Sequence, residues 1–321
     1  MRCETGTQSV GVIGARGYVG RELVRLLDEH PVLQTTLAVS RELAGRRVAS
    51  EYGVDTGGLS FSSSYTPAND ECPDVVVLGL PNGHARSVVE EMEASGATPR
   101  VILDLSADFR FDESWVYGVP ELHATRLRGA ARIANPGCYA TAMQLALAPV
   151  LARLDADPCC FGVSGYTGAG TSPSEKNDAE TLAQGLLTYA PVGHTHEREV
   201  SRQLGRPVRF APCVAGYPRG ITLTALLELE HATDQDELLG LYEAHYVGAE
   251  CVSVQRDGTP RVQHVVRTPG AIVGGVAVDE AAPKRAAVVC VLDNLLKGAA
   301  SQAVQNINLA LGIEHTTGLT P

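Results

Sequence analysis

Residues 10–20 read VGVIGARGYVG and decide the fold of the first half of the chain. An apolar run ends at Ile13, three glycines follow at three-residue spacing, and an amphipathic stretch continues to Glu29. This order predicts a buried strand, a tight turn and a helix, the arrangement that binds a dinucleotide pyrophosphate at a helix N-terminus. A tight turn without a ligand is the alternative interpretation. The residues of the turn that we expect to bind the cofactor are Gly14, Arg16, Gly17, Tyr18 and Val19.

The rest of the first half alternates short β-rich runs with helical patterns. The strand-like runs span residues 10–13, 36–39, 75–80 and 101–105, and the helical patterns span residues 18–29 and 85–94. Strands that alternate with helices favour a parallel sheet with helices on both of its faces. The sequence therefore predicts an α/β, doubly wound fold of the Rossmann type for this part of the chain.

The pattern changes after the turn Asn135-Pro136-Gly137. Apolar side chains at helical spacing predict one long helix over Cys138–Leu154, and strand-like runs then span residues 161–164, 221–228, 250–254 and 286–292. Strands with few helices between them indicate a mixed or antiparallel sheet, and hence a second, α+β domain. Residues 293–311 are helical again and can pack back on the first domain. The predicted domains are residues 1–138 plus 292–321, and residues 139–291.

Two residues at the end of the second strand indicate which dinucleotide is bound. NAD-binding units usually place Asp or Glu there, about 20 residues beyond the glycines, to bind the ribose 2′-hydroxyl. This chain has Ser40 and Arg41 instead. A hydroxyl and a guanidinium suit a 2′-phosphate, so the expected cofactor is NADP(H).

Cys138 differs from the other cysteines because it lies where a turn becomes a helix. A helix N-terminus favours the thiolate, which is the nucleophilic form, whereas a buried structural thiol is the alternative. His194 and His196 form an HxH pattern, and His196 is the candidate acid/base partner. A metal site with Glu197 or Glu199 as third ligand is the minor alternative, because no further cysteine or histidine lies close enough in sequence to complete it. We therefore expect no metal.

The composition describes an ordinary globular protein. The 321 residues, 44% hydrophobic and 20% charged, predict two domains at about 150 residues each. A net charge of −11 gives no general attraction for nucleic acid or an anionic membrane. Residues 1–9 are polar, and no apolar run is long enough to span a membrane. The eight cysteines, Cys3 included, show no CxxC pair, so we expect mostly buried, reduced thiols in a cytoplasmic protein.

Three basic residues in loops are candidates for binding an anionic substrate. Arg110 follows the segment DLSADF, Arg219 lies in YPRGI, and Lys176 lies in the loop of residues 172–177. Each can bind a carboxylate or a phosphate, and each can equally be a surface charge. Arginine offers a planar, two-pronged match to such anions, so we rank the two arginines above the lysine.

Taken together, these segments resemble the N-acetyl-γ-glutamyl-phosphate reductases, NADPH-dependent enzymes of arginine biosynthesis. The resemblance is carried along most of the chain by GVIGARGYVGRELVRLL from Gly11, LPNGHA from Leu80, DLSADFR from Asp104, YGVPEL from Tyr117, NPGCYATA from Asn135, His196-x-x-Glu199 and RGIT from Arg219. NPGCYAT and SADFR are far more specific than the glycine turn. The chain departs from the family pattern at Asn82, where the family often has histidine, and in a longer loop over residues 162–177.

The resemblance implies a Rossmann-type domain that binds NADP(H) and an α+β domain that carries catalysis and the contacts of a homodimer or tetramer. The residue roles that it implies are Cys138 as nucleophile, His196 as acid/base, Pro81 as a cofactor contact, and Arg110 and Arg219 as substrate contacts. It also implies an acyl-phosphate substrate that is reduced through a cysteine thioester, with release of phosphate.

Several other functions share part of this pattern. An aspartate-semialdehyde dehydrogenase, or a reductase of the one-carbon-longer aminoadipyl substrate, would use the same mechanism, and the NPGCYAT form favours the acetylglutamyl branch. A non-enzymatic NADPH-binding redox sensor would use Cys138 as a switch. A thiol hydrolase would explain Cys138 and His196 but would leave the glycine turn and Arg41 without a purpose.

Overall fold

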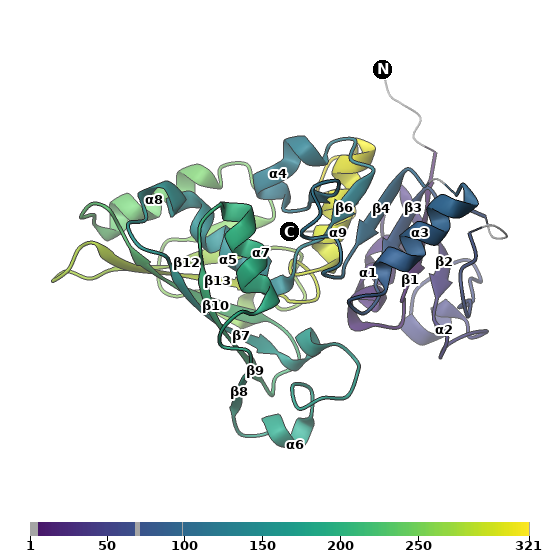
Figure 1. Cartoon of the computed structure of the whole chain (residues 1–321), viewed down its shortest axis with the longest axis horizontal. Coiled ribbons are helices and arrows are strands. Elements are labelled where there is room, and N and C mark those ends of the chain that lie inside the picture. The colour runs from purple at the N-terminus through teal and green to yellow at the C-terminus, as the bar shows by residue number, and fades with distance from the viewer. Residues whose placement is uncertain (1–5, 68–70, 98, 321) are drawn as a thin grey trace. The chain divides into compact units, whose positions relative to one another are not determined.

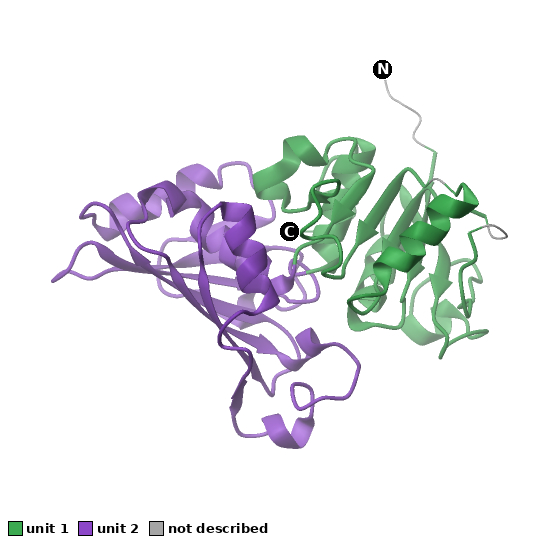
Figure 2. Ribbon diagram, in the orientation of Figure 1, with its two compact units in different colours: residues 1–136, 299–320 green, residues 137–298, 321 purple. Residues whose placement is uncertain are grey.

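The computed structural model describes residues 6–67, 71–97 and 99–320, so the expectation for Cys3 lies outside the described residues. The chain divides into two compact units, Met1–Pro136 with Ala299–Thr320 and Gly137–Gly298 (Figure 2). The sequence placed these boundaries after residues 138 and 291. The difference moves Cys138 into the second unit, because it is the first residue of a helix that packs in the core of that unit.

Unit 1 is built on a parallel sheet. In sheet order, the described strands are β2 (Leu33–Val39), β1 (Gln8–Ile13), β3 (Val75–Leu78), β4 (Val101–Asp104), β6 (Arg132–Ala134) and β5 (Val116–Tyr117). All neighbouring pairs are parallel. In the sheet, β2 lies on one side of β1, and β3 and β4 follow on the other side. Because crossover connections between parallel strands are right-handed, this order places α1 (Tyr18–Asp28) and α3 (Ala85–Ser95) on opposite faces of the sheet (Figure 1). The doubly wound fold is confirmed.

Helix α9 (Ala300–Leu311) returns to unit 1 and contacts α1, α4 (Pro120–Leu127) and β4. The expectation of one helical stretch over residues 293–311 is wrong, because the helix begins only at Ala300. The residues before it turn around Asp293, whose carboxylate accepts hydrogen bonds from the main-chain N–H groups of Leu295 and Leu296. The remaining helix of unit 1 is α2 (Val48–Tyr52).

Unit 2 is built on a mixed sheet, as the sequence predicted. In sheet order, its described strands are β11 (Val252–Gln255), β12 (Ala271–Val278), β13 (Arg285–Leu292), β10 (Ile221–Glu228), β7 (Cys159–Gly165), β9 (Arg209–Ala215) and β8 (Leu186–Thr188). One face is covered by α5 (Cys138–Leu147), α7 (Thr195–Leu204) and α8 (Gln235–His245), whose apolar side chains form one core with the sheet (Figure 1). The short helix α6 (Ala179–Leu182) and the 3₁₀ turns η2 (Tyr166–Ala169) and η3 (Val262–His264) lie in its loops.

The helix that begins at Cys138 is shorter than expected. The sequence predicts Cys138–Leu154, but α5 ends at Leu147 and a 3₁₀ segment, η1 (Ala148–Arg153), follows. Pro149 lies at the start of this segment and has no N–H to donate to the preceding turn. The α-helix therefore does not continue past that point.

The seven cysteines of the described residues form no disulfide, and Cys160, Cys213, Cys251 and Cys290 are buried as expected. Cys159 is exposed, because it occupies a position of β7 that points away from the helices. Within the same residues, no helix has both the length and the apolar character that crossing a membrane requires.

His30 joins the turn after α1 to helix α9. Its Nδ1 accepts hydrogen bonds from the main-chain N–H groups of Val32 (3.1 Å) and Leu33 (2.9 Å), and its Nε2 lies 3.1 Å from Oδ1 of Asn308. A neutral ring that carries its proton on Nε2 satisfies all three contacts. Burial lowers the pKa of His30, and the hydrogen bond to Asn308 opposes this only in part.

We expect His30→Gln to lower the apparent Tm more at neutral than at acid pH. The unfolded chain binds a proton on this histidine near pH 6.5, about its ordinary value, whereas the folded ring stays neutral to a lower pH. The stability that the neutral ring contributes is therefore present above about pH 6.5 and is lost as the pH falls toward the folded pKa. Thermal unfolding of both proteins between about pH 5 and 8 measures this difference. A constant gap in Tm across that range would contradict it.

Candidate active site

The glycine turn lies where the carboxyl ends of β1, β2 and β3 meet. Gly14 has φ +90°, and a Cβ at this position would overlap the carbonyl oxygen of Gly79, the residue after β3. The N–H groups of Gly14 and Ala15 donate to the carbonyl of Val39 at 3.1 and 3.0 Å. Gly17 precedes α1 as its N-cap. This is the point where strand order reverses, and a cradle free of side chains before a helix N-terminus fits a dinucleotide pyrophosphate.

The residues expected to read the 2′-phosphate lie at the end of β2. Ser40 is buried, and its Oγ accepts a hydrogen bond from the N–H of Leu43 at 3.2 Å. Arg41 is exposed. Arg16 of the glycine turn pairs with Glu42 at 2.9 Å, which links the turn to the loop after β2. The structure thus brings Ser40 and Arg41 to the same edge of the sheet as the glycine turn, next to Tyr18 and Val19 in the first turn of α1.

Pro81 lies in an exposed loop after β3, and a side-chain network connects this loop to the loop after β4. Oδ1 of Asn82 accepts from the N–H of Ala107 at 3.0 Å, and Asp108 accepts from the N–H of Ala85 at 2.9 Å. Asn82 is the position at which the chain departs from the family pattern. Asn82 therefore joins the loop of the motif LPNGHA, after β3, to the loop of the motif DLSADFR, after β4.

Arg110 is buried in unit 1. Its Nε donates to the carbonyl oxygen of Asn135 and its Nη2 to that of Leu105, both at 2.9 Å. These contacts hold the main chain directly before Pro136. They give Arg110 a structural role, and its assignment as a substrate contact stays a prediction.

Cys138 is the first residue of α5, and Gly137 is its N-cap. The thiol is partly buried, and the N-cap glycine has no side chain that could cap the helix itself. The N–H of Gly137 donates to Oε1 of Glu199 at 2.9 Å, and Glu199 is completely buried on α7. The start of α5, with its N–H groups and the positive end of the helix dipole, thus carries the thiol. The carboxylate of Glu199 fixes the residue directly before it.

Gly298 packs directly against Cys138. A Cβ at Gly298 would lie 2.7 Å from the Cβ of Cys138 and 2.6 Å from the carbonyl oxygen of Asn294. Only a residue without a side chain fits there. Sequence reasoning missed this neighbour, because nothing in the segment DNLLKG indicates that it folds against a residue 160 positions earlier.

The two histidines of the HxH pattern have different roles. His194 is the N-cap of α7, and its Nδ1 accepts a hydrogen bond from the N–H of His196 at 3.1 Å. Burial lowers the pKa of His194, and the nearby charge of Lys176 lowers it further, so the ring is neutral and able to accept. The ring of His196 lies with its centroid 6.1 Å from that of Tyr139, the residue after Cys138.

Helix α7 packs against α5 and presents His196 and Glu199 on one face, because residues three apart are neighbours on a helix. Glu197, on another face, accepts hydrogen bonds from the N–H groups of Gly193 and Phe210, both at 3.0 Å. The carboxylates that a metal site would need therefore already bind main-chain donors. The arrangement favours a thiol with a neighbouring acid/base histidine.

Two tyrosines of unit 2 respond to the charge of Cys138. Tyr139 is buried, and its hydroxyl donates to the carbonyl oxygen of Cys213 at 2.5 Å. Burial raises the pKa of Tyr139 and of Tyr189, and the negative charge of a Cys138 thiolate raises both further. Both phenols therefore stay protonated, and both lie near enough to Cys138 to respond to its charge.

Arg219 follows β9 and is bound by a buried acid. Its Nε and Nη2 donate to the two carboxylate oxygens of Asp293 at 2.8 and 3.1 Å, a bidentate pair. Asp293 precedes the segment that reaches Gly298 and Cys138. Arg219 therefore fixes that segment, and its assignment as a substrate contact stays a prediction.

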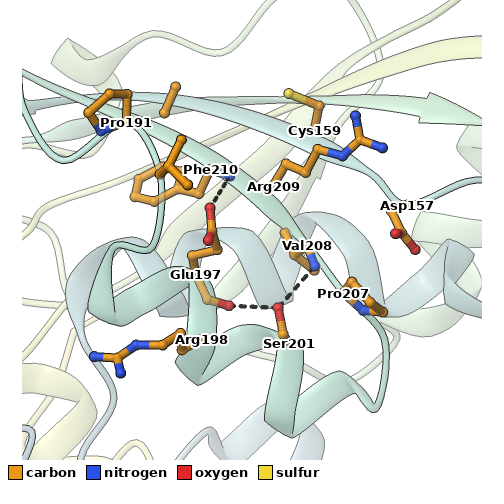
Figure 3. A pocket seen from close by; sticks show the side chains of 12 residues that line it. Asp157, Cys159, Pro191, Glu197, Arg198, Ser201, Pro207, Val208, Arg209 and Phe210 are labelled. Atoms are coloured by element: carbon orange, nitrogen blue, oxygen red, sulfur yellow. Dashed lines mark hydrogen bonds between the residues drawn. The ribbon is translucent and has the colours of Figure 1, made fainter.

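A cavity of about 680 Å³ in unit 2 has residues of α7 and β9 in its lining (Figure 3). Neither Cys138 nor His196 lines it. Figure 3 shows two hydrogen bonds in its lining: Glu197 accepts from the N–H of Phe210, and Ser201 accepts from the N–H of Val208 at 2.9 Å. The cavity is therefore not the thiol site.

The hydrogen bond between Glu199 and Gly137 can be tested by two substitutions. Glu199→Gln retains an acceptor oxygen, whereas Glu199→Ala leaves a buried N–H without one, at a cost of about 1–3 kcal/mol. We expect the alanine variant to lose about 3–9 °C in Tm and the glutamine variant less than about 2 °C. The exposed Glu230→Ala is the matched control. Equal losses in the two Glu199 variants would show that charge, not the acceptor, holds α7 to α5.

Comparison with known proteins shows the family to which the chain belongs. Residues 9–130 match the semialdehyde dehydrogenase NAD binding domain, and residues 138–294 match the semialdehyde dehydrogenase dimerisation domain. The N-acetyl-gamma-glutamyl-phosphate reductase of Xanthomonas oryzae pv. oryzae is 47% identical over 317 residues, which are 98% of each chain. That of Stenotrophomonas maltophilia is 48% identical over 314 residues, again 98% of each chain.

Solved structures share the fold at lower identity. A probable aspartate-semialdehyde dehydrogenase from Pseudomonas aeruginosa has a TM-score of 0.77 at 22% identity, covering 95% of this chain and 98% of that one. Aspartate semialdehyde dehydrogenase II from Vibrio cholerae, complexed with ASA, has a TM-score of 0.73 at 18% identity with the same coverage. The chain therefore belongs to the semialdehyde dehydrogenase family and, within it, to the N-acetyl-gamma-glutamyl-phosphate reductases.

Proposed function

We propose that this chain reduces N-acetyl-γ-glutamyl phosphate to N-acetylglutamate 5-semialdehyde with NADPH and releases phosphate, a step of arginine biosynthesis. The observation that carries the proposal is the position of Cys138 at the first residue of α5, with His196 and Glu199 on the helix that packs against it. The relatives at 47% and 48% identity support the same substrate.

The first half of the reaction is an acyl transfer to Cys138. Its thiolate forms a bond to the carbonyl carbon of the acyl phosphate, and the carbon–oxygen bond to phosphate then breaks as phosphate leaves. N–H groups at the start of α5 stabilise the oxyanion of the tetrahedral intermediate. The product of this half is a thioester on Cys138.

The second half converts the thioester to the aldehyde. Bound NADPH supplies the hydride that reduces the thioester carbonyl. His196 holds the proton that the oxyanion needs, and it takes that proton back as the carbon–sulfur bond breaks and the thiolate of Cys138 leaves. The neutral phenols of Tyr139 and Tyr189 add no negative charge beside the thiol.

Unit 1 has the features of an NADP(H) site. Gly14 and Gly17 leave room for the pyrophosphate at the start of α1, and Arg41 offers a guanidinium to the 2′-phosphate at the end of β2. Arg16, Ser40 and Pro81 belong to the loops at the same edge of the sheet.

The experiment that tests the proposal runs the reaction backward. NADP⁺ reduction is followed with N-acetylglutamate 5-semialdehyde, with and without inorganic phosphate. We expect turnover that requires phosphate, because phosphate must release the acyl group from Cys138. Turnover with aspartate semialdehyde or the one-carbon-longer homologue alone would overturn the substrate. Silence with all three aldehydes, despite binding of NADPH, would favour the redox sensor.

We also propose that the chain forms a homo-oligomer through the face of the unit 2 sheet that α5, α7 and α8 leave open. Phe161 and Leu226 point from this face, 45% and 54% exposed. They are diagonal neighbours on the same face, because Leu226 pairs with Cys159 and Thr224 with Phe161. Adjacent exposed apolar side chains on a sheet favour an interface, and the match to a dimerisation domain supports this.

Charges on this face should separate the protomers. We expect Phe161→Glu or Leu226→Glu to lower the mass measured by sedimentation to that of a single chain. Val247→Glu, at a position 82% exposed in another part of unit 2, is the control. An unchanged mass in the sheet variants would place the contact elsewhere.

We also propose that the protein is cytoplasmic. The cysteines of the described residues form no disulfide, which fits a reducing compartment.

A further inference from the structure

The loop that carries Lys176 is held in one shape by Asn177. The Nδ2 of Asn177 donates to the carbonyl oxygens of Gly170 (3.0 Å) and Ser172 (2.7 Å), and its Oδ1 accepts from the N–H of Ser174 at 2.8 Å. These contacts of one amide join residues on both sides of the loop. These hydrogen bonds therefore fix the backbone conformation of the loop at Lys176.

The ammonium group of Lys176 lies 4.9 Å from the centroid of the Tyr189 ring. The side chain is half-buried, and among residues 6–67, 71–97 and 99–320 none forms an ion pair with it. An aromatic face attracts a cation without neutralising its charge. The ammonium group of Lys176 is therefore held against the Tyr189 ring without a carboxylate partner among the described residues.

A series of ring contacts leads from this lysine to Tyr139, the residue after Cys138. The centroid of Tyr189 lies 5.6 Å from that of His194, and His194 lies 4.7 Å from His196. The ring centroid of His196 lies 6.1 Å from that of Tyr139, and the two rings are tilted by 58°. The charge of Lys176 reaches this cluster, because it lowers the pKa of His194.

The two arginines that ranked above Lys176 in the sequence are engaged by the protein itself. Arg219 forms a bidentate pair with the buried Asp293, and Arg110 donates to main-chain carbonyls within unit 1. In a protein of net charge −11, an anionic substrate needs a local cation. Lys176 supplies one within unit 2, on the same ring cluster as His196.

We propose that Lys176 binds an anionic group of the substrate, its phosphate or its carboxylate, beside His196. This rests on the proposed function and deepens it, because it names the residue that holds the substrate in unit 2. The ammonium group of a lysine is a compact charge with three donors. It can therefore bind either anion without the planar, bidentate geometry that a guanidinium requires.

The reverse reaction separates the two anions. The KM for inorganic phosphate and the KM for N-acetylglutamate 5-semialdehyde are measured separately for wild type, Lys176→Gln and Lys176→Arg. We expect Lys176→Gln to raise one of the two KM values about tenfold or more, with kcat changed much less, and Lys176→Arg to restore most of the loss. A higher KM for inorganic phosphate would show that Lys176 binds the phosphate. A higher KM for the aldehyde would show that Lys176 binds its carboxylate.

Lys284→Gln removes the same charge from an exposed turn of unit 2 and should change neither KM. Unchanged KM values in Lys176→Gln, or an equal change in Lys284→Gln, would overturn the proposal, as would a fall in kcat alone.

A binding measurement does not depend on turnover. Inorganic phosphate or N-acetylglutamate should slow alkylation of Cys138 by iodoacetamide, followed on its peptide by mass spectrometry. In Lys176→Gln, the concentration of either inorganic phosphate or N-acetylglutamate that gives the same protection should be about tenfold higher. Equal protection in wild type and variant, or none in either, would overturn the role of Lys176. An inactive wild type that still shows Lys176-dependent protection would instead overturn the proposed reaction.

Discussion

Cys138→Ser is expected to lower kcat/KM by at least about a thousandfold, with NADPH binding unchanged. A hydroxyl at the start of α5 stays protonated where a thiol ionises, so the acyl transfer loses its nucleophile. The glycine turn belongs to the other unit of the chain, so its affinity for the cofactor does not depend on this side chain. Phosphate-dependent reduction of NADP⁺ measures the loss, and fluorescence titration with NADPH measures the binding.

Cys159→Ser is the matched control, because Cys159 is the exposed cysteine of the described part of unit 2. It should retain full turnover. Wild-type turnover in Cys138→Ser would refute the thioester mechanism. An equal loss in both variants would point to general damage rather than to chemistry at Cys138.

Gly14→Ala is expected to lower the apparent Tm by about 5–10 °C and to weaken NADPH binding at least about tenfold. The added Cβ would meet the carbonyl of Gly79, and φ +90° is strained for any residue with a side chain. The loops after β1 and β3 must then move apart. Because those loops form the cradle, stability and affinity fall together. Thermal unfolding and NADPH titration of the same preparation measure the two effects.

Gly17→Ala separates the demands of the protein from those of the ligand. Gly17 has φ −58°, and a Cβ there would have only one contact within 4 Å, the carbonyl oxygen of Gly14 at 3.5 Å. The variant should therefore keep its Tm within about 3 °C while it loses affinity for NADPH about tenfold or more. A large fall in Tm would show that the fold, not the pyrophosphate, requires this glycine. Unchanged affinity would remove Gly17 from the cofactor site.

Local patterns were sufficient for much of the fold. The turn after Ile13 could be predicted because strand, glycines and helix follow one another within a few residues. The alternation of Ile221–Glu228 likewise matches the observed strand β10. The helix start at Cys138 could be read from NPG, but its end could not, because Pro149 still allows a 3₁₀ turn. Such features depend on neighbours in the chain, which the sequence shows directly.

The candidate site was less predictable because its contacts join residues far apart in the chain. Arg219 and Lys176 both lie in loops, and a general preference for arginine at anion sites ranked Arg219 higher without any knowledge of its partners. The decisive partner of Arg219 is Asp293, which is 74 positions away. Glu199 was visible as a carboxylate three residues after His196, but its contact with Gly137 depends on how α7 packs against α5.

Helix α9 has a consequence for the order in which the protein is made. Unit 2 is continuous along the chain, whereas unit 1 needs both its first 136 residues and residues 299–320. A ribosome adding roughly 5–20 residues per second takes between about 8 and about 33 seconds to pass from the end of β6 to α9. During that interval α1 and α4 lack the helix they pack against. The part of the chain that is synthesised first is therefore the last to be completed, and a stop codon before α9 would damage it rather than unit 2.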